Sequence, residues 1–356
     1  MANDMNINIM MIGGRRCGKT SVLAVMKANF DKEFGRSNLT ITTKGNTVLL
    51  NDKLDQMKEL YDLREKETRF TPDDSPSDAK TEYRIELSLK NKPNGKINYT
   101  FIDFPGEWLQ NDEHTDELNS VVENSSVILV AIDTPFLMEE TPDNTENTVG
   151  RYNEKRNRSG VICDFLKSLQ LDTNEKMVIF VPLKCEKYLH EGRMDLVNKR
   201  IHTAYKSYFD HVQNDENRAK CTTVIAPIFT FGTVEFTRFK REGADVIIDK
   251  EYKTPKYPLY RFTDDAGSGP EPQYCEQPLL YVLLYVLKCA EAMKLKQYDK
   301  GLLSKLFVSL SDTFLKMPSA KDFLNEIKHI EGAIKKNGDG YEIITDPYGL
   351  KGLHIE

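Results

Sequence analysis

The feature that most constrains the fold of this 356-residue chain is an octapeptide at residues 13–20, which reads Gly-Gly-Arg-Arg-Cys-Gly-Lys-Thr. It matches the pattern G-x-x-x-x-G-K-[ST]. The apolar residues 6–12 before it predict a buried strand, and residues 20–30 after it have helical character. A strand, a glycine loop and a helix in this order form a phosphate-binding loop. We therefore expect an α/β fold that opens with such a loop.

Each position of the octapeptide has an expected role. Gly13, Gly14 and Gly18 permit a turn whose backbone N–H groups surround a diphosphate, next to the positive end of the following helix. Lys19 would reach the β- and γ-phosphates, and the Thr20 hydroxyl would bind Mg²⁺. The other residues predicted to line the phosphate site are Arg15, Arg16, Cys17 and Ser21. The competing interpretation is a glycine turn that opens a helix and holds no ligand.

A second motif begins where an apolar strand ends at Asp103, and it reads Asp-Phe-Pro-Gly over residues 103–106. At the carboxyl end of a strand beside the phosphate loop, Asp103 can hold Mg²⁺ through a water molecule. The backbone N–H of Gly106 can then contact a terminal phosphate. The pattern D-x-x-G is common in turns, and it is informative here because it follows a phosphate loop.

Apolar runs and turn residues predict strands that alternate with helices. The predicted strands cover residues 82–89, 97–104, 127–132, 177–181 and 223–229, and the predicted helices cover residues 52–67, 161–169, 195–211 and 278–293. The sequence Asn-Lys-Pro-Asn-Gly at 91–95 predicts a hairpin between the first two strands. This alternation predicts a mostly parallel sheet with helices on both faces.

Charge and composition limit the possible partners. Forty-nine basic against 55 acidic side chains give a formal net charge of −6, which argues against a nucleic-acid binder or a protein that binds anionic membranes. The six cysteines form no C-x-x-C pair and stand at no zinc-finger spacing, so we expect reduced, buried thiols. Residues 1–11 contain no Lys or Arg, and the longest apolar run, 279–287, is too short to span a bilayer. These features predict a cytoplasmic protein without a transmembrane segment.

These motifs together resemble those of a known family. The phosphate loop, the Asp-Phe-Pro-Gly at 103–106 and the Lys-Cys-Glu at 184–186 are similar to the motifs of P-loop GTPases of the translation-factor-related (TRAFAC) class. Residues 106–108, 181–188 and 231–236 also resemble the bacterial double-GTPase group. The resemblance implies a three-layer α/β P-loop NTPase fold, like that of a small GTPase, with GTP or GDP and Mg²⁺ as ligands. Because the chain contains a single phosphate loop, it holds no tandem pair of such sites.

The resemblance also implies a domain organisation. We expect a P-loop GTPase domain over residues 1–296 and a helical C-terminal extension over residues 297–356. Residues 31–81 of the domain would form an enlarged switch region, and the aromatic segments among charges and prolines at 232–275 predict an inserted hairpin or loop. Within the extension, two helices and a small strand pair are expected at 302–315, 320–332 and 338–356.

The base-reading motif of the family is Asn/Thr-Lys-x-Asp at the end of a strand, and this chain has Leu-Lys-Cys-Glu at 183–186. The resemblance implies that Lys184 packs across the base and that the Glu186 carboxylate accepts from guanine N1–H and N2–H. Two positions depart from the motif, leucine for Asn/Thr and glutamate for aspartate, and both bear on guanine specificity. The alternative is a solvated Lys184–Glu186 charge pair. A second base-contacting loop is expected near residues 230–233.

Catalytic positions also follow from the resemblance. Small GTPases have a glutamine directly after the D-x-x-G glycine that orients the attacking water, and Glu107 takes this place here. A carboxylate there can act as a base but brings negative charge close to the phosphate, and a solvent-facing loop residue is the alternative. The switch threonine that caps Mg²⁺ is assigned to Thr71, with Thr81 as its competitor. Arg16 or Arg69 would serve as an arginine in cis, unless the loop arginines face solvent or pair with acidic neighbours.

These interpretations predict a Mg²⁺-dependent GTP-binding protein that hydrolyses GTP slowly and acts as a molecular switch for a protein effector or regulator. Two other classes stay open at this point. One is an ATP-using P-loop ATPase or kinase, although no kinase lid motif is recognisable. The other is a nucleotide-bound interaction module without hydrolysis, with which Glu107 and Arg15 are compatible. Base preference and turnover separate the three classes.

Overall fold

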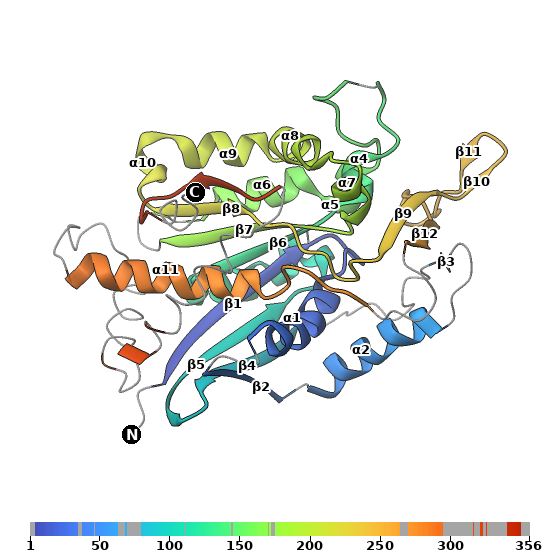
Figure 1. Ribbon diagram of the computed structural model, residues 1–356. Helices are drawn as coiled ribbons and strands as arrows, with labels where there is room; N and C mark the ends of the chain where they lie inside the picture. Colours follow the sequence, from blue (N-terminus) through green and yellow to red (C-terminus); the bar gives the residue numbers. More distant parts are fainter. Residues whose placement is uncertain are drawn as a thin grey trace.

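The computed structural model describes residues 4–34, 38–45, 47–62, 68–69, 80–110, 112–143, 145–169, 171, 175–263, 270–294, 316, 321–322, 325 and 340–349. At their centre lies a sheet of eight strands in the order β13-β8-β7-β6-β1-β5-β4-β2 (Figure 1). The strands are β1 (Met5–Gly13), β2 (Leu39–Gly45), β4 (Thr81–Leu89), β5 (Lys92–Asp103), β6 (Val127–Asp133), β7 (Lys176–Leu183), β8 (Cys221–Ile225) and β13 (Glu342–Thr345). The neighbours from β8 to β5 pair in parallel, and the outer pairs are antiparallel. The predicted mostly parallel α/β sheet is confirmed.

The central strands are apolar on both faces. Every residue of β6 and β7 is buried, which is typical of parallel strands that are covered from both sides. In β1 the side chains alternate, so that Ile7 and Ile9 join the core on one face of the sheet while Met10 and Ile12 join the core on the other. The continuous apolar runs of the sequence therefore mark strands at the centre of the sheet.

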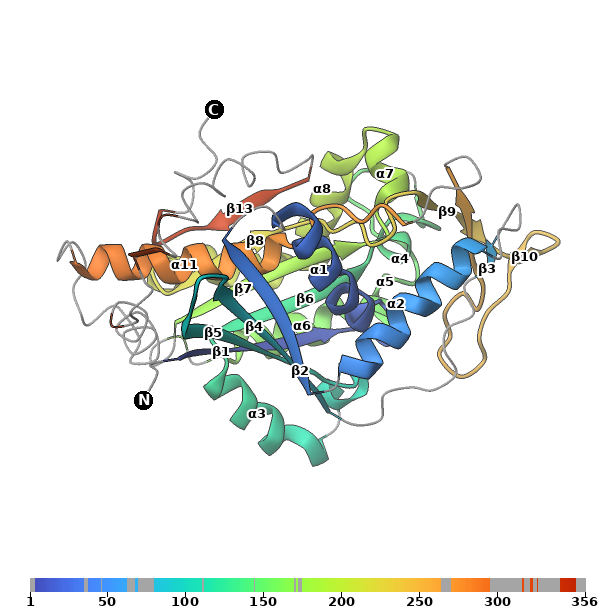
Figure 2. The same cartoon turned by 60° about the horizontal axis from the view of Figure 1, so that its bottom comes forward.

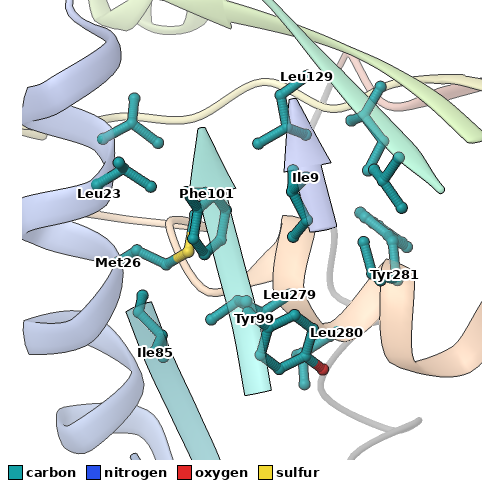
Figure 3. Close-up of a cluster of buried hydrophobic side chains, with 14 of the residues drawn as sticks. Ile9, Leu23, Met26, Ile85, Tyr99, Phe101, Leu129, Leu279, Leu280 and Tyr281 are labelled. Carbon is teal, nitrogen blue, oxygen red and sulfur yellow. The ribbon is translucent and has the colours of Figure 1, made fainter. Parts of the chain in front are cut away.

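Helices cover both faces and complete three layers (Figures 1 and 2). The helices on one face are α1 (Lys19–Phe34), α2 (Thr47–Asp62) and α11 (Gln277–Lys294). Those on the other face are α3 (Thr115–Asn124), α6 (Ser159–Lys167), α8 (Met194–Ala204) and α9 (Lys206–Gln213). Figure 3 shows the first core, where Leu23 of α1 and Tyr281 of α11 pack around the strands next to Ile9. The three-layer P-loop fold predicted from the motifs is thus present.

Smaller elements lie around this core. The second sheet has the order β3-β12-β9, from β3 (Thr68–Arg69), β9 (Val234–Phe239) and β12 (Pro258–Phe262), and β10 (Arg241–Glu242) pairs with β11 (Asp245–Val246). The short helices are η1 (Gly106–Gln110), η2 (Asp112–His114), α4 (Thr134–Met138), α5 (Asn153–Asn157), α7 (Glu186–His190) and α10 (Asp215–Arg218). Strands β9 and β12, which lie within residues 232–275, are antiparallel neighbours. Strand β3, which pairs with β12, comes from the predicted switch region.

Several elements differ from the sequence prediction. The β4–β5 hairpin is confirmed, but its turn lies at Lys90 and Asn91, because Leu89 already pairs with Lys92. The helix predicted over 195–211 is two helices, α8 and α9, which meet at Tyr205. Strand β8 ends at Ile225 instead of residue 229, just before Pro227, whose ring nitrogen cannot donate to a ladder.

Two edge strands were not foreseen in their places. Residues 31–80 are largely polar and predict no strand, yet β2 pairs antiparallel with β4 and buries Leu39 and Ile41. At the other edge, the described part of the strand pair expected at 338–356 contains β13, which pairs with β8 in the central sheet. The helices predicted over 302–315 and 320–332 fall almost wholly outside the described residues. Among the described helices, none is both long and apolar enough to cross a membrane.

Candidate nucleotide-binding site

The octapeptide folds into a tight loop between the end of β1 and the start of α1, as predicted. Three of its residues have a positive φ, with +151° at Gly13, +61° at Arg16 and +112° at Gly18. A Cβ atom on Gly14 would lie 1.7 Å from the carbonyl oxygen of Arg156, so only glycine fits there. The loop glycines therefore serve both a turn and a close backbone approach.

Lys19 lies across this loop. Its Nζ donates to the carbonyl oxygens of Gly13 and Gly14, at 3.4 and 3.5 Å, and stands 3.7 Å from Asp103 Oδ1. Burial lowers the pKa of Lys19, but the Asp103 carboxylate opposes burial and the net pKa is above its usual value. A buried ammonium thus lies between the backbone of the loop and the Asp103 carboxylate.

Asp103 and Thr20 form the candidate metal position. The Thr20 hydroxyl donates to Asp103 Oδ2 at 3.3 Å, and Oδ1 has no hydrogen-bond partner among the described residues. Burial raises the pKa of Asp103, while the Lys19 ammonium opposes that rise. A hydroxyl and a carboxylate are oxygen ligands of the kind that Mg²⁺ prefers, and this ion keeps several waters beside them. The predicted third ligand, Thr71, lies outside the described residues, and its competitor Thr81 pairs in register with Asp103.

The D-x-x-G glycine packs directly against the phosphate loop. A Cβ atom on Gly106 would lie 2.8 Å from the carbonyl oxygen of Gly13 and 3.1 Å from the backbone nitrogen of Arg15. Gly106 opens η1, in which Trp108 stacks on His114 with ring centroids 3.9 Å apart. The two motifs, more than 80 residues apart in sequence, therefore form one site, and Trp108 anchors the second of them.

Glu107 and the loop arginines are in contact. Arg15 Nη1 stands 3.7 Å from Glu107 Oε1, so Arg15 pairs with an acidic neighbour, which was one of the predicted alternatives. The guanidinium carbons of Arg15 and Arg16 lie 4.7 and 5.9 Å from the ring centroid of Tyr252. Tyr252 belongs to the insertion, and no sequence pattern indicated this contact.

Lys184 contacts the backbone of the phosphate loop. It has a left-handed backbone, with φ of +58°, and its Nζ stands 2.7 Å from Asp133 Oδ2 and 3.4 Å from the carbonyl oxygen of Arg16. The same two acceptors bind Arg156, through Nε at 3.1 Å and Nη2 at 3.3 Å. Asp133, at the end of β6, is fully buried. The argument used for Asp103 also applies to Asp133, because Asp133 ends the strand next to β1. No sequence pattern indicated Arg156.

Glu186 opens α7 and is buried, with 2% of its surface exposed. Its Oε1 accepts from the backbone N–H of Phe231 at 3.4 Å, so it meets the 230–233 loop that was predicted to contact the base. Burial raises the pKa of Glu186 to about 7. Since Glu186 is buried and Lys184 pairs with Asp133, the two side chains are not a solvated charge pair.

Known proteins resemble this chain in part. A family model described as Double-GTPase 2 matches residues 7–217. No curated protein sequence matches the chain. Similar solved structures include the S. cerevisiae Ski7 GTPase-like domain bound to GDP and inorganic phosphate, at 15% identity over 63% of this chain and 43% of that chain, with a TM-score of 0.32. The same domain bound to GTP aligns at 16% identity over 71% of this chain and 48% of that chain, with a TM-score of 0.37.

Both alignments span less than half of the Ski7 chains. The family model, by contrast, covers more than half of this chain and includes the phosphate loop, the D-x-x-G segment, Lys184 and Glu186. The chain belongs to the Double-GTPase 2 family of P-loop GTPases.

Proposed function

We propose that this protein binds GTP and GDP together with Mg²⁺, hydrolyses GTP slowly and acts as a nucleotide-controlled switch. The observation that carries the proposal is the convergence of Lys19, Thr20 and Asp103 at the phosphate loop, with Gly106 packed against the backbone of that loop. This set matches the terminal phosphates of a nucleoside triphosphate and its metal ion. Membership in a GTPase family supports guanine as the base.

Mg²⁺ would be held by Thr20 and Asp103, with Thr71 as the proposed third protein ligand. When bound, the ion would offset negative charge on the β- and γ-phosphate oxygens. Lys19 adds a second positive charge on the same side, and its ion pair with Asp103 places that charge next to the metal position. The protein contributes orientation and charge here, and these are the main needs of phosphoryl transfer.

Base recognition would involve Lys184 and Glu186. Lys184 leaves β7 in a left-handed conformation beside the phosphate loop, which suits a side chain that packs across the base. Glu186, beside the 230–233 loop, offers the carboxylate that guanine N1–H and N2–H require, whereas adenine presents no matching pair of donors. This arrangement favours GTP over ATP.

For hydrolysis we propose that Glu107 orients the attacking water and accepts its proton. The water oxygen forms a bond to the γ-phosphorus, the bond from phosphorus to the β–γ bridging oxygen breaks, and its electron pair stays on GDP. Glu107 by itself would repel the phosphate oxygens, but the Arg15 guanidinium at 3.7 Å offsets that charge. Loss of the γ-phosphate then removes a contact at Gly106, and this change would be read by a protein effector or regulator.

Location and domain organisation complete the proposal. We propose a cytoplasmic location, a GTPase domain over residues 1–296 and an extension over residues 297–356. The β13 strand of that extension pairs with β8, so the extension contributes to the central sheet.

The decisive experiment is a titration of fluorescent GTP, GDP and ATP into the purified full chain with Mg²⁺, followed by measurement of phosphate release. We expect tighter binding of GTP than of ATP and slow turnover. Lys19→Ala should abolish binding, because it removes the charge at the loop, and Glu107→Ala should reduce turnover by about 100-fold with unchanged binding. The exposed pair of Lys206 and Asp210 offers Lys206→Ala as a matched control.

Other outcomes would point to the other two classes. A preference for ATP would contradict the assignment of Glu186 and favour an ATPase or kinase. Tight GTP binding without phosphate release, equal in wild type and Glu107→Ala, would identify a nucleotide-bound interaction module. Absence of binding to all three nucleotides would refute the proposed function.

A further inference from the structure

We propose that Tyr252, in the 232–275 insertion, is a positioning residue for GTP hydrolysis that holds the Arg15 guanidinium over the phosphate loop. This inference rests on the proposed GTPase function and deepens it. It assigns the insertion a role in the catalytic step, in which the insertion supplies one wall of the site.

The contact is specific in its geometry. Arg15 Nη1 donates a hydrogen bond to the Tyr252 hydroxyl, and the guanidinium carbon lies 4.7 Å from the centroid of the Tyr252 ring. The same Nη1 stands 3.7 Å from Glu107 Oε1, and the Arg15 side chain is only 21% exposed. The guanidinium is thus held between the insertion and the residue that follows D-x-x-G.

The segment that carries Tyr252 is folded. Asp249 Oδ1 accepts from the backbone N–H groups of Glu251 and Tyr252 at 2.9 and 3.1 Å, and the Asp249 N–H donates to the carbonyl oxygen of Thr254 at 2.8 Å. A bridge between Ile248 and Pro255 closes this tip. The 249–254 tip therefore presents Tyr252 in a defined direction, toward the phosphate loop.

The Arg15 backbone lies next to Gly106, and this position bears on catalysis. The backbone nitrogen of Arg15 lies 3.1 Å from the Cβ position of Gly106, beside the expected place of the γ-phosphate. The guanidinium itself stands 3.7 Å from Glu107, the residue after Gly106, and from there it can offset the charge that develops in the transition state. An arginine side chain has many rotamers, and the ring and hydroxyl of Tyr252 restrict them before the nucleotide binds. The contact should therefore affect kcat more than the affinity for the ground state.

The test measures GTP turnover and nucleotide affinity of Tyr252→Ala in the full chain. We expect kcat to fall about tenfold, with KM and the Kd for GDP within about twofold of wild type. Tyr252→Phe keeps the ring and should recover about half of the loss on a logarithmic scale. Tyr257→Ala is the matched control, because the ring of this tyrosine, in the same insertion, contacts Lys240 and Lys256.

A second readout does not depend on turnover. GDP with aluminium fluoride mimics the transition state, and we expect Tyr252→Ala to weaken its binding about tenfold while GDP binding is unchanged. Arg15→Ala should weaken it as well, and the double variant Arg15→Ala/Tyr252→Ala should be no worse than Arg15→Ala. Such non-additivity shows that Tyr252 acts through Arg15.

The outcomes separate this inference from the proposed function. A Tyr252→Ala protein that equals wild type in both readouts overturns the inference alone, as does an undiminished effect in the Arg15→Ala background. A change in GDP affinity equal to the change in kcat/KM would mean a structural role and also overturn it. A wild type that binds no nucleotide overturns both proposals.

Discussion

Lowering the pH from 8 to 6 should weaken GDP binding through Glu186. Burial raises the pKa of this carboxyl to about 7 in the free protein, whereas guanine needs the ionised form as its acceptor. With that pKa, roughly nine-tenths of the Glu186 side chains are ionised at pH 8 and roughly one-tenth at pH 6. Because only the ionised fraction is competent, the Kd should rise about tenfold, which corresponds to about 1.4 kcal/mol.

The assay is a titration of fluorescent GDP between pH 6 and pH 8, with Glu186→Gln as the reference. The phosphates of the nucleotide titrate in the same range, and the variant corrects for them because it retains the phosphate loop. Between pH 8 and pH 6 we expect the Kd for GDP to rise about tenfold more in wild type than in Glu186→Gln. At pH 6, binding of GDP should also release the Glu186 proton to the buffer. Equal pH dependence of the two proteins would refute the assignment of Glu186 as the base acceptor.

The same pKa shift predicts the sign of a stability effect. The pKa of Glu186 in the folded protein, about 7, is higher than the value of about 4.3 in an unfolded chain, so folding favours the protonated form. Its contribution to stability is therefore fully present below pH of about 4 and is lost as the pH rises through about 7. The free energy of unfolding of Glu186→Gln, followed in urea, should lack this component.

Two further predictions concern the loop and its support. Gly14→Ala should destabilise the protein by about 3 kcal/mol in urea unfolding, because its Cβ would meet the Arg156 carbonyl oxygen at 1.7 Å, whereas the control Gly160→Ala meets only the flexible Glu154 side chain. Unchanged stability of the first variant would contradict the described loop. Asp133→Asn should cost about 3 kcal/mol, because it leaves two cations without their buried carboxylate, while the exposed Asp210→Asn should cost less than about 0.5 kcal/mol. Equal losses in these two aspartate variants would show that the Asp133 cluster contributes little.

Local patterns predicted the parts of the site that depend on neighbouring residues. The order of strand, glycine loop and helix assigns roles to Lys19 and Thr20 within a few positions. Asp103 followed from a topological rule, since the carboxyl ends of parallel strands meet at one edge of a sheet. Thr20 and Asp103 do meet there, 83 positions apart. The apolar runs of β6 and β7 likewise predicted the central sheet, because burial on both faces leaves a continuous signal.

The edge strands left a weaker signal. In β2 only Leu39 and Ile41 are clearly buried, and polar threonines lie between and after them, so the segment reads as irregular. Strand β13 follows a long segment and pairs with β8, more than 110 positions earlier in the chain. An edge strand buries little surface of its own. Its position depends on which neighbouring strand still has unpaired backbone N–H and C=O groups when the sheet forms.

Amino-acid sequence by itself predicted the phosphate loop, the meeting of Thr20 with Asp103 and the parallel core of this protein, because each is encoded by spacing within one segment or by a rule of parallel sheets. Only the tertiary structure decided the partners of the charged residues around that loop. Lys184 pairs with Asp133 instead of Glu186, and Arg15 lies between Glu107 and Tyr252. Those contacts join segments that are 50 to more than 200 positions apart, and a charged side chain carries no local signal of which distant partner burial will bring to it.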